Sequence, residues 1–148
     1  MKIKTNYFKF AILIAMLSLT NFQAFSQSGY SLNEIIGKTW IMSGMTDKTY
    51  EDVYDNTTIT SSLKDNSEKK YVFKFEYYLS DSIEDSFDPN KVGKVKTGKY
   101  LIERPLKDSK SNPNQPQPIT IMEIKELSSS RLVLCNIKQQ NNLVFTKK

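Results

Sequence analysis

Histidine is absent from this sequence, and cysteine occurs once, at Cys135. Without an imidazole group, every catalytic triad or proton shuttle that depends on histidine is excluded. One thiol without histidine cannot supply the ligands of a structural zinc site, and a single cysteine cannot form an internal disulfide. Because Cys135 ends an apolar run at 132–135, we expect a buried small hydrophobic residue there and not a reactive thiol.

Glycine is also scarce, with five scattered residues and no glycine-rich phosphate loop. Carboxylates are dense only in the segment 81–88, DSIEDSFD, which lacks the spacing and the central glycine of a calcium loop. We interpret this acidic loop as a solvated rim. A glycosidase would need two acids facing each other across a cleft, and the sequence singles out no such pair. We therefore expect no enzyme, no metal site and no cofactor.

The first 26 residues have the three parts of an export signal peptide. A segment with three lysines and no acid precedes an apolar run at 10–19, and Ala24-Phe25-Ser26 places small residues before a cut at Gln27. A run of about ten residues covers roughly 15 Å as a helix, which is half of what a bilayer core requires. No cysteine follows the run to carry a lipid. We expect cleavage and a mature chain, 27–148, that has no stable membrane anchor and is periplasmic or secreted.

The charge of the mature chain is small. The precursor carries a formal charge of +5, and removal of three lysines with the leader leaves +2. Lysines alternate with acids along the rest of the chain, whereas nucleic-acid-binding proteins gather them on one face. The composition thus gives no reason to expect a nucleic-acid partner, and the length suits a single domain.

Alternating apolar residues predict a domain rich in β-strands. The most regular segment is 70–80, where Tyr71, Phe73, Phe75, Tyr77 and Leu79 share one face. A short helical turn is predicted between Ser31 and Ile36. The remaining strands are predicted at 38–45, 50–61, 94–104, 119–125, 131–137 and 142–147.

Two further features qualify this pattern. Gly98 indicates a bulge or a close approach of another backbone. The segment 105–118 contains four prolines, so we expect an exposed loop there. About seven short strands without alternating helices argue for an antiparallel sheet, which protects its edges by closing into a barrel or folding into a sandwich.

Several short segments carry a resemblance to a known family. They are Ile35-Ile36-Gly37-Lys38-Thr39-Trp40, Thr97-Gly98-Lys99-Tyr100-Leu101-Ile102, Arg131-Leu132-Val133-Leu134 and Leu143-Val144-Phe145-Thr146-Lys147. In this order the chain resembles the small lipocalin-like domains of exported Bacteroidetes-type proteins. The resemblance implies an all-β antiparallel meander barrel of about seven or eight strands with a short N-terminal helical turn. It also implies that Trp40 plugs the closed end, with Lys147 as the basic residue above it.

The aromatic stripe supplies the candidate ligand-binding residues. They are Trp40, Tyr71, Phe73, Phe75, Tyr77 and Tyr100. In a barrel they would either line a cup for a small hydrophobic molecule or simply fill the core. Two functions remain open: a non-enzymatic exported binding protein, or an interaction module that contacts another envelope protein through the acidic loop and the loop 105–118.

Overall fold

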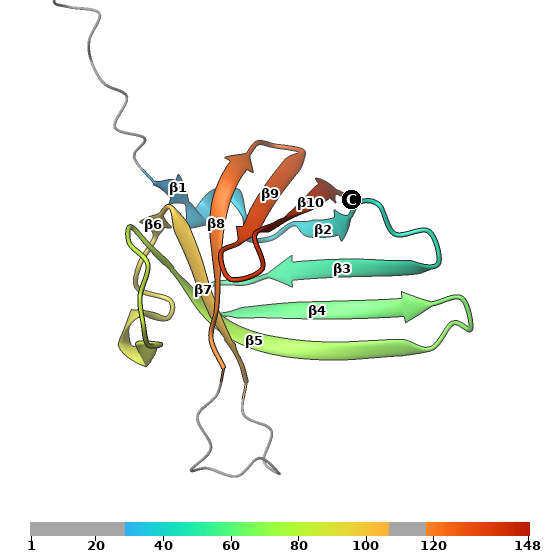
Figure 1. The fold of residues 1–148 in the computed structure, drawn as a ribbon, viewed down its shortest axis with the longest axis horizontal. Helices are drawn as coiled ribbons and strands as arrows, with labels where there is room; N and C mark the ends of the chain where they lie inside the picture. The colour runs from blue at the N-terminus through green and yellow to red at the C-terminus, as the bar shows by residue number, and fades with distance from the viewer. Residues whose placement is uncertain (1–28, 107–117) are drawn as a thin grey trace, which may run out of the picture.

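The computed structural model describes residues 29–106 and 118–148, so the leader and most of the proline-rich segment lie outside the described residues. The elements, shown in Figure 1, are β1 (Tyr30–Ser31), η1 (Leu32–Glu34), β2 (Thr39–Met42), β3 (Lys48–Tyr54), β4 (Thr58–Asp65), β5 (Lys70–Ser80), η2 (Pro89–Lys91), β6 (Thr97–Gly98), β7 (Tyr100–Pro105), β8 (Thr120–Leu127), β9 (Arg131–Asn136) and β10 (Asn141–Lys147). Both helices are single 3-10 turns. Within the described ranges, no helix is long and apolar enough to cross a membrane.

Eight of the strands form a closed antiparallel barrel in the order β10-β2-β3-β4-β5-β7-β8-β9. Each strand in this order is antiparallel to the next, and β10 closes the barrel by pairing with β2, with Phe145 opposite Met42 and Lys147 opposite Trp40. This closing pair satisfies the backbone groups that an open sheet would leave at its edges. The prediction of an all-β meander barrel is confirmed, and the sandwich is excluded.

Two predicted strands are each divided in the structure. The segment 50–61 is a hairpin, because the Asp55 carboxylate accepts the backbone N–H groups of Thr57 and Thr58 at 2.7 and 2.6 Å and so turns the chain. The segment 94–104 is divided at Lys99 into β6 and β7. A Cβ atom on Gly98 would lie 2.5 Å from the Ser80 backbone nitrogen, so the predicted close approach is confirmed.

One end of the barrel is closed by the N-terminal turn. Leu32 and Ile35 are buried beneath Trp40, whose indole Nε1–H donates to the Ile35 carbonyl at 3.1 Å. Gly37, with φ of 71°, ends this turn in the left-handed conformation that glycine tolerates. The ammonium group of Lys38 lies 5.5 Å from the centre of the indole ring, and Lys147, the basic residue that the resemblance suggested for this end, is directly opposite Trp40 in the closing strand pair.

Candidate functional site

The faces of the strands follow from their pairing, because directly opposite residues in an antiparallel ladder point to the same side. Leu79 is opposite Leu101, and Leu101 is opposite Met122; all three belong to the buried core and mark the inside of the barrel. The other inward positions follow by counting in steps of two along each strand.

The inward-facing residues are buried at one end of the barrel and accessible at the other. At the Trp40 end they are fully buried, as Tyr54, Ile59 and Tyr77 show. At the opposite end, where β7 ends and β8 begins, the inward residues are half-buried. They comprise Met42, Tyr50, Leu63, Phe75, Glu103, Thr120 and Leu143. We call this set the mouth of the barrel.

The six residues predicted to bind a ligand are divided among four places, and Tyr100 is the one that lies on the outer face. Trp40 and Tyr77 belong to the solid core; the Tyr77 hydroxyl donates to the Asp55 carbonyl at 2.5 Å. Phe75 lies at the mouth. Phe73 and Tyr71 continue the same face but are 49 % and 39 % exposed, because β3, β4 and β5 extend beyond the rest of the barrel (Figure 1).

Two predictions about individual residues are wrong. Tyr100 is opposite Ser80 on the outer face and does not line the interior. Its strand alternates Tyr100 and Ile102 outward with Leu101 and Glu103 inward, so apolar side chains occur on both faces. Cys135 is half-buried opposite Glu123 on the outer face and is not a core residue.

A polar cluster lies inside the barrel next to the mouth. Asp52 is 5 % exposed, and one of its carboxylate oxygens accepts a hydrogen bond of 2.5 Å from the Ser61 hydroxyl on the neighbouring strand. The hydroxyl of Tyr54 is fully buried near Asp52, yet it has no hydrogen-bond partner among the described residues. Glu103, on β7, is surrounded by protein but still partly accessible, as expected for a side chain that faces the mouth.

Burial raises the pKa values of the two carboxyl groups in this part of the barrel, Asp52 and Glu103. Desolvation raises the pKa of Asp52 to about 6, although the hydroxyls of Ser61, Tyr50 and Tyr54 act in the opposite direction. Desolvation, together with the charge of Asp52, raises the pKa of Glu103 to about 8. The two carboxyls are thus close enough to repel each other across the interior, so at neutral pH the pair retains about one proton.

Sequence reasoning missed both carboxylates. Asp52 stands between Tyr50 and Tyr54 at a spacing of two, which places a charge on an aromatic face. That spacing was a usable signal. Glu103 gave none, because its strand is apolar on both faces and its nearness to Asp52 is created by barrel closure.

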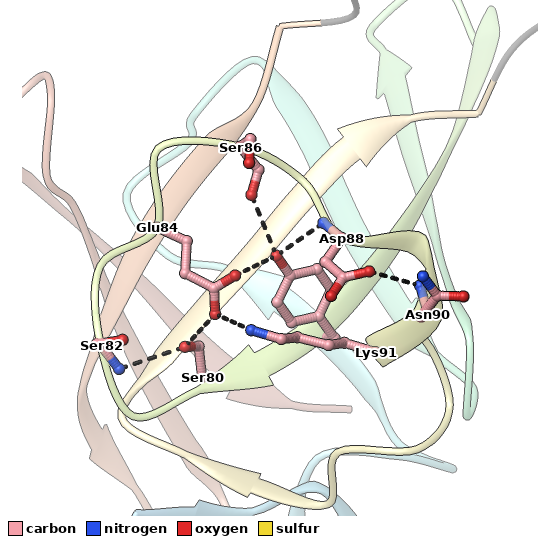
Figure 2. Close-up of polar contacts among 8 residues, drawn as sticks. Ser80, Ser82, Glu84, Ser86, Asp88, Asn90 and Lys91 are labelled. Atoms are coloured by element: carbon pink, nitrogen blue, oxygen red, sulfur yellow. Dashed lines mark hydrogen bonds and ion pairs between the residues drawn. The ribbon is translucent and has the colours of Figure 1, made fainter.

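The acidic loop belongs to a different layer, on the outside of the barrel. Tyr78 points outward from β5 and is 1 % exposed, because the chain after it folds back over the ring and places Phe87 at a ring-centre distance of 5.0 Å. Figure 2 shows the polar contacts of this cover. One Glu84 oxygen accepts from Ser80 at 2.6 Å and from Lys91 at 2.8 Å, and the other accepts from the Tyr78 hydroxyl at 2.9 Å.

The loop is therefore not the fully solvated rim that we expected. Glu84 and Phe87 are half-buried, and Asp88 caps η2 by accepting the Asn90 backbone N–H at 2.9 Å. Desolvation raises the pKa of the Glu84 carboxyl, but the hydrogen bonds from Lys91, Ser80 and Tyr78 together outweigh it and hold the pKa below its usual value. Among the described residues, no cluster of three or more acids or thiols is placed to hold a metal ion.

Comparison with known proteins supports the fold. No known family model matches this sequence, and no curated protein sequence matches it. One solved structure that matches is a lipocalin-like protein from Bacteroides uniformis, with a TM-score of 0.50 over 78 % of this chain and 99 % of that chain. The fold is lipocalin-like. At 14 % sequence identity, this likeness shows the fold alone.

Proposed function

We propose that this chain is an exported, non-enzymatic lipocalin-like protein that binds a small organic molecule in the mouth of its barrel. The carrying observation is the gradient of burial along the inward-facing residues, from Trp40 in solid core to half-buried Phe75 and Leu143. Apolar side chains that stay accessible on the inward face of a closed sheet offer a contact surface for a ligand. The polar groups beside them orient the bound molecule through hydrogen bonds.

A fluorescent probe tests binding at the mouth. N-phenyl-1-naphthylamine is uncharged at neutral pH and fluoresces more strongly in apolar surroundings. We expect saturable binding that is at least tenfold weaker in Leu63→Trp, because this substitution fills the mouth. Val72→Trp is the matched control, since it adds the same ring to the outer face of the neighbouring strand. Equal binding by both variants, or none by the unaltered protein, would contradict the proposal.

Export is tested by the mass of the product. After expression of the full chain in a Gram-negative host, we expect a periplasmic or secreted protein whose intact mass corresponds to residues 27–148. Ala24→Lys places a charge in the small-residue cleavage segment and should leave the leader attached. Gln27→Ala, one residue past the cut, should be processed normally. Recovery of uncleaved, cytoplasmic protein would refute this part of the proposal.

Docking of another envelope protein is the second candidate function, and a pocket between the acidic loop and the start of β8 favours it. The pocket, of about 530 Å³, lies between the acidic loop and the segments 118–121 and 136–139, with Ile119 and Ile137 beside Glu84 and Asp85. A photo-crosslinker placed at Lys138 in the native host should then yield one defined adduct, whereas the same group at Lys64 should not. Equal labelling from both positions would count against docking.

A further inference from the structure

Asp52 and Glu103 place two carboxylates inside a barrel whose surroundings are otherwise largely apolar. Neither of them belongs to an ion pair within the described residues. By contrast, several acids of the outer surface, among them Glu76 and Glu123, have a cationic partner. Carboxylates withdrawn from water without a cation are costly, and proteins keep them chiefly where a ligand or a reaction uses them.

The Tyr54 hydroxyl is a second, independent sign of a missing partner. It is fully buried and makes no hydrogen bond among the described residues. Desolvation raises the pKa of Tyr54, and the charges of Asp52, Glu103, Tyr50 and Tyr77 raise it further, so the hydroxyl lies among these groups. A buried hydroxyl without a partner costs roughly 1–3 kcal/mol. A ligand with N–H donors would satisfy the phenolic oxygen and both carboxylates together.

The surroundings of the carboxylates favour an organic cation over a metal ion. The half-buried inward-facing residues at this end of the barrel include Met42, Phe75 and Leu143, whose side chains contact alkyl or aryl groups well. Calcium takes six to eight oxygen ligands, whereas this cluster offers two carboxylates and a few hydroxyls. An ammonium group needs only a few acceptors and carries an apolar body with it.

Resting on the proposed function, we infer that the mouth binds a protonated organic amine, with the ammonium group between Asp52 and Glu103 near the Tyr54 hydroxyl. The amine's apolar body lies on Met42, Phe75 and Leu143. A neutral apolar ligand would leave both carboxylates without a cation and the Tyr54 hydroxyl without a hydrogen-bond partner.

The inference predicts a proton exchange. Among the residues that the structure describes, Tyr50 and Tyr54 from β3, Ser61 from β4, Tyr77 from β5 and Thr120 from β8 face the pair, and none of these five is cationic. The carboxyl pair retains about one proton at neutral pH, and an ammonium ion displaces it. Affinity for an amine therefore rises as the pH increases from 6 to 8.5, until the amine itself loses its proton.

Isothermal titration calorimetry with matched probes tests the charge. The probes are 2-phenylethylamine and hexylamine, compared with 2-phenylethanol and 1-hexanol as their neutral counterparts. At pH 8 we expect each amine to bind at least tenfold more tightly than its alcohol, and roughly tenfold more tightly than at pH 6. In two buffers of different ionisation enthalpy, the heat should show release of about one proton at pH 7.

Single substitutions test whether Asp52 and Glu103 cause the preference for amines and the proton release. Glu103→Gln should remove most of the preference for the amine and most of the proton release, and Asp52→Asn should do the same. Glu126→Gln, on an exposed acid paired with Arg131, should change neither. Equal affinity for amine and alcohol, or displacement of the naphthyl probe by calcium but not by amines, would overturn the inference.

The two proposals fail in different ways. If the naphthyl probe binds at the mouth while the amines show no advantage over the alcohols, the ligand class is wrong and the binding function stands. If the naphthyl probe also fails to bind, both are wrong.

Discussion

Glu103 illustrates how one side chain can limit the stability of this protein. Its pKa in the folded chain, about 8, lies above the ordinary glutamate value, so the folded state holds the proton more tightly than the unfolded state. The stability that this group contributes is present below about pH 4.5 and is lost as the pH rises toward 8. Asp52, with a pKa of about 6, acts in the same direction over a lower range.

Glu103→Gln should therefore stabilise the protein in alkaline solution. Glutamine keeps the size of the side chain but never ionises, so it avoids the cost of burying a charge. We expect an increase of about 1–3 kcal/mol in the free energy of unfolding at pH 9, reduced from the full linkage value because Glu103 is partly accessible. Near pH 4 the variant and the parent should be equal. Urea titrations at both pH values measure this, and a loss of stability at pH 9 would show that the charge is compensated.

Tyr54 and Tyr77 form a matched pair for a second test. Their rings are 5.6 Å apart in an edge-to-face contact and both are fully buried, but only the Tyr77 hydroxyl has a hydrogen-bond acceptor. Tyr77→Phe should lower the free energy of unfolding by about 1 kcal/mol. Tyr54→Phe should leave it unchanged or raise it by up to about 2 kcal/mol, since it removes an unsatisfied group. Equal losses in urea denaturation would mean that Tyr54 has a partner after all.

At the scale of elements, β5 carries aromatic or aliphatic side chains that are buried on both of its faces. Its inward residues build the core, while its outward Tyr78 is covered by Phe87 of the returning chain 81–91. Ile102, opposite Tyr78 on β7, is also fully buried. The loop is held by few hydrogen bonds, most of which converge on the Tyr78 hydroxyl and the Glu84 carboxylate (Figure 2). Such a segment is expected to open separately from the barrel.

Tyr78→Phe should loosen this loop without weakening the barrel itself. The substitution leaves the Asp88 backbone N–H and one Glu84 oxygen without their partner. We expect hydrogen exchange to accelerate several-fold at residues 81–91, with a stability loss of about 1–2 kcal/mol. Tyr100→Phe, a half-buried tyrosine on the same outer face, should not have this effect. Faster exchange throughout the barrel strands would argue against an independent loop.

At the scale of the whole molecule, the two ends of the barrel serve different purposes. The Trp40 end is solid and is sealed by the N-terminal turn, and the far end leaves half-buried side chains facing inward. A closed eight-stranded sheet has room for a packed core or for one small ligand. Under the proposed function, this chain divides its interior between the two.

Substitutions at the two ends should therefore separate stability from binding. Trp40→Ala leaves a cavity in packed core and removes a buried hydrogen bond, so we expect a loss of about 3–5 kcal/mol in the free energy of unfolding. Phe75→Ala, at the mouth, should lower the free energy of unfolding by only about 1–2 kcal/mol, because the site is already accessible. The same substitution should weaken binding of the naphthyl probe at least tenfold. Urea denaturation and probe titration on both variants measure this. Equal stability losses would contradict a mouth at the Phe75 end.

The local features of the chain were predictable from its sequence. The strand 70–80 was predicted to the residue because its period of two is regular, and Gly98 was recognised as a close approach. The hairpin within 50–61 was missed, because its turn depends on hydrogen bonds from a single side chain, that of Asp55. The leader and the loop 107–117 lie outside the described residues, so the export prediction rests on the sequence alone.

Tertiary structure alone decided which charges meet. Alternation specifies that neighbours in a strand face opposite ways, but it does not say which face becomes the inside where both are apolar, as at Tyr100 and Leu101. Asp52 and Glu103 are on β3 and β7, which are not neighbours, and only closure of the barrel brings their charges within reach of each other. The sequence by itself determined an all-β chain with an aromatic stripe, whereas the acidic mouth arises from the curvature and closure of the sheet.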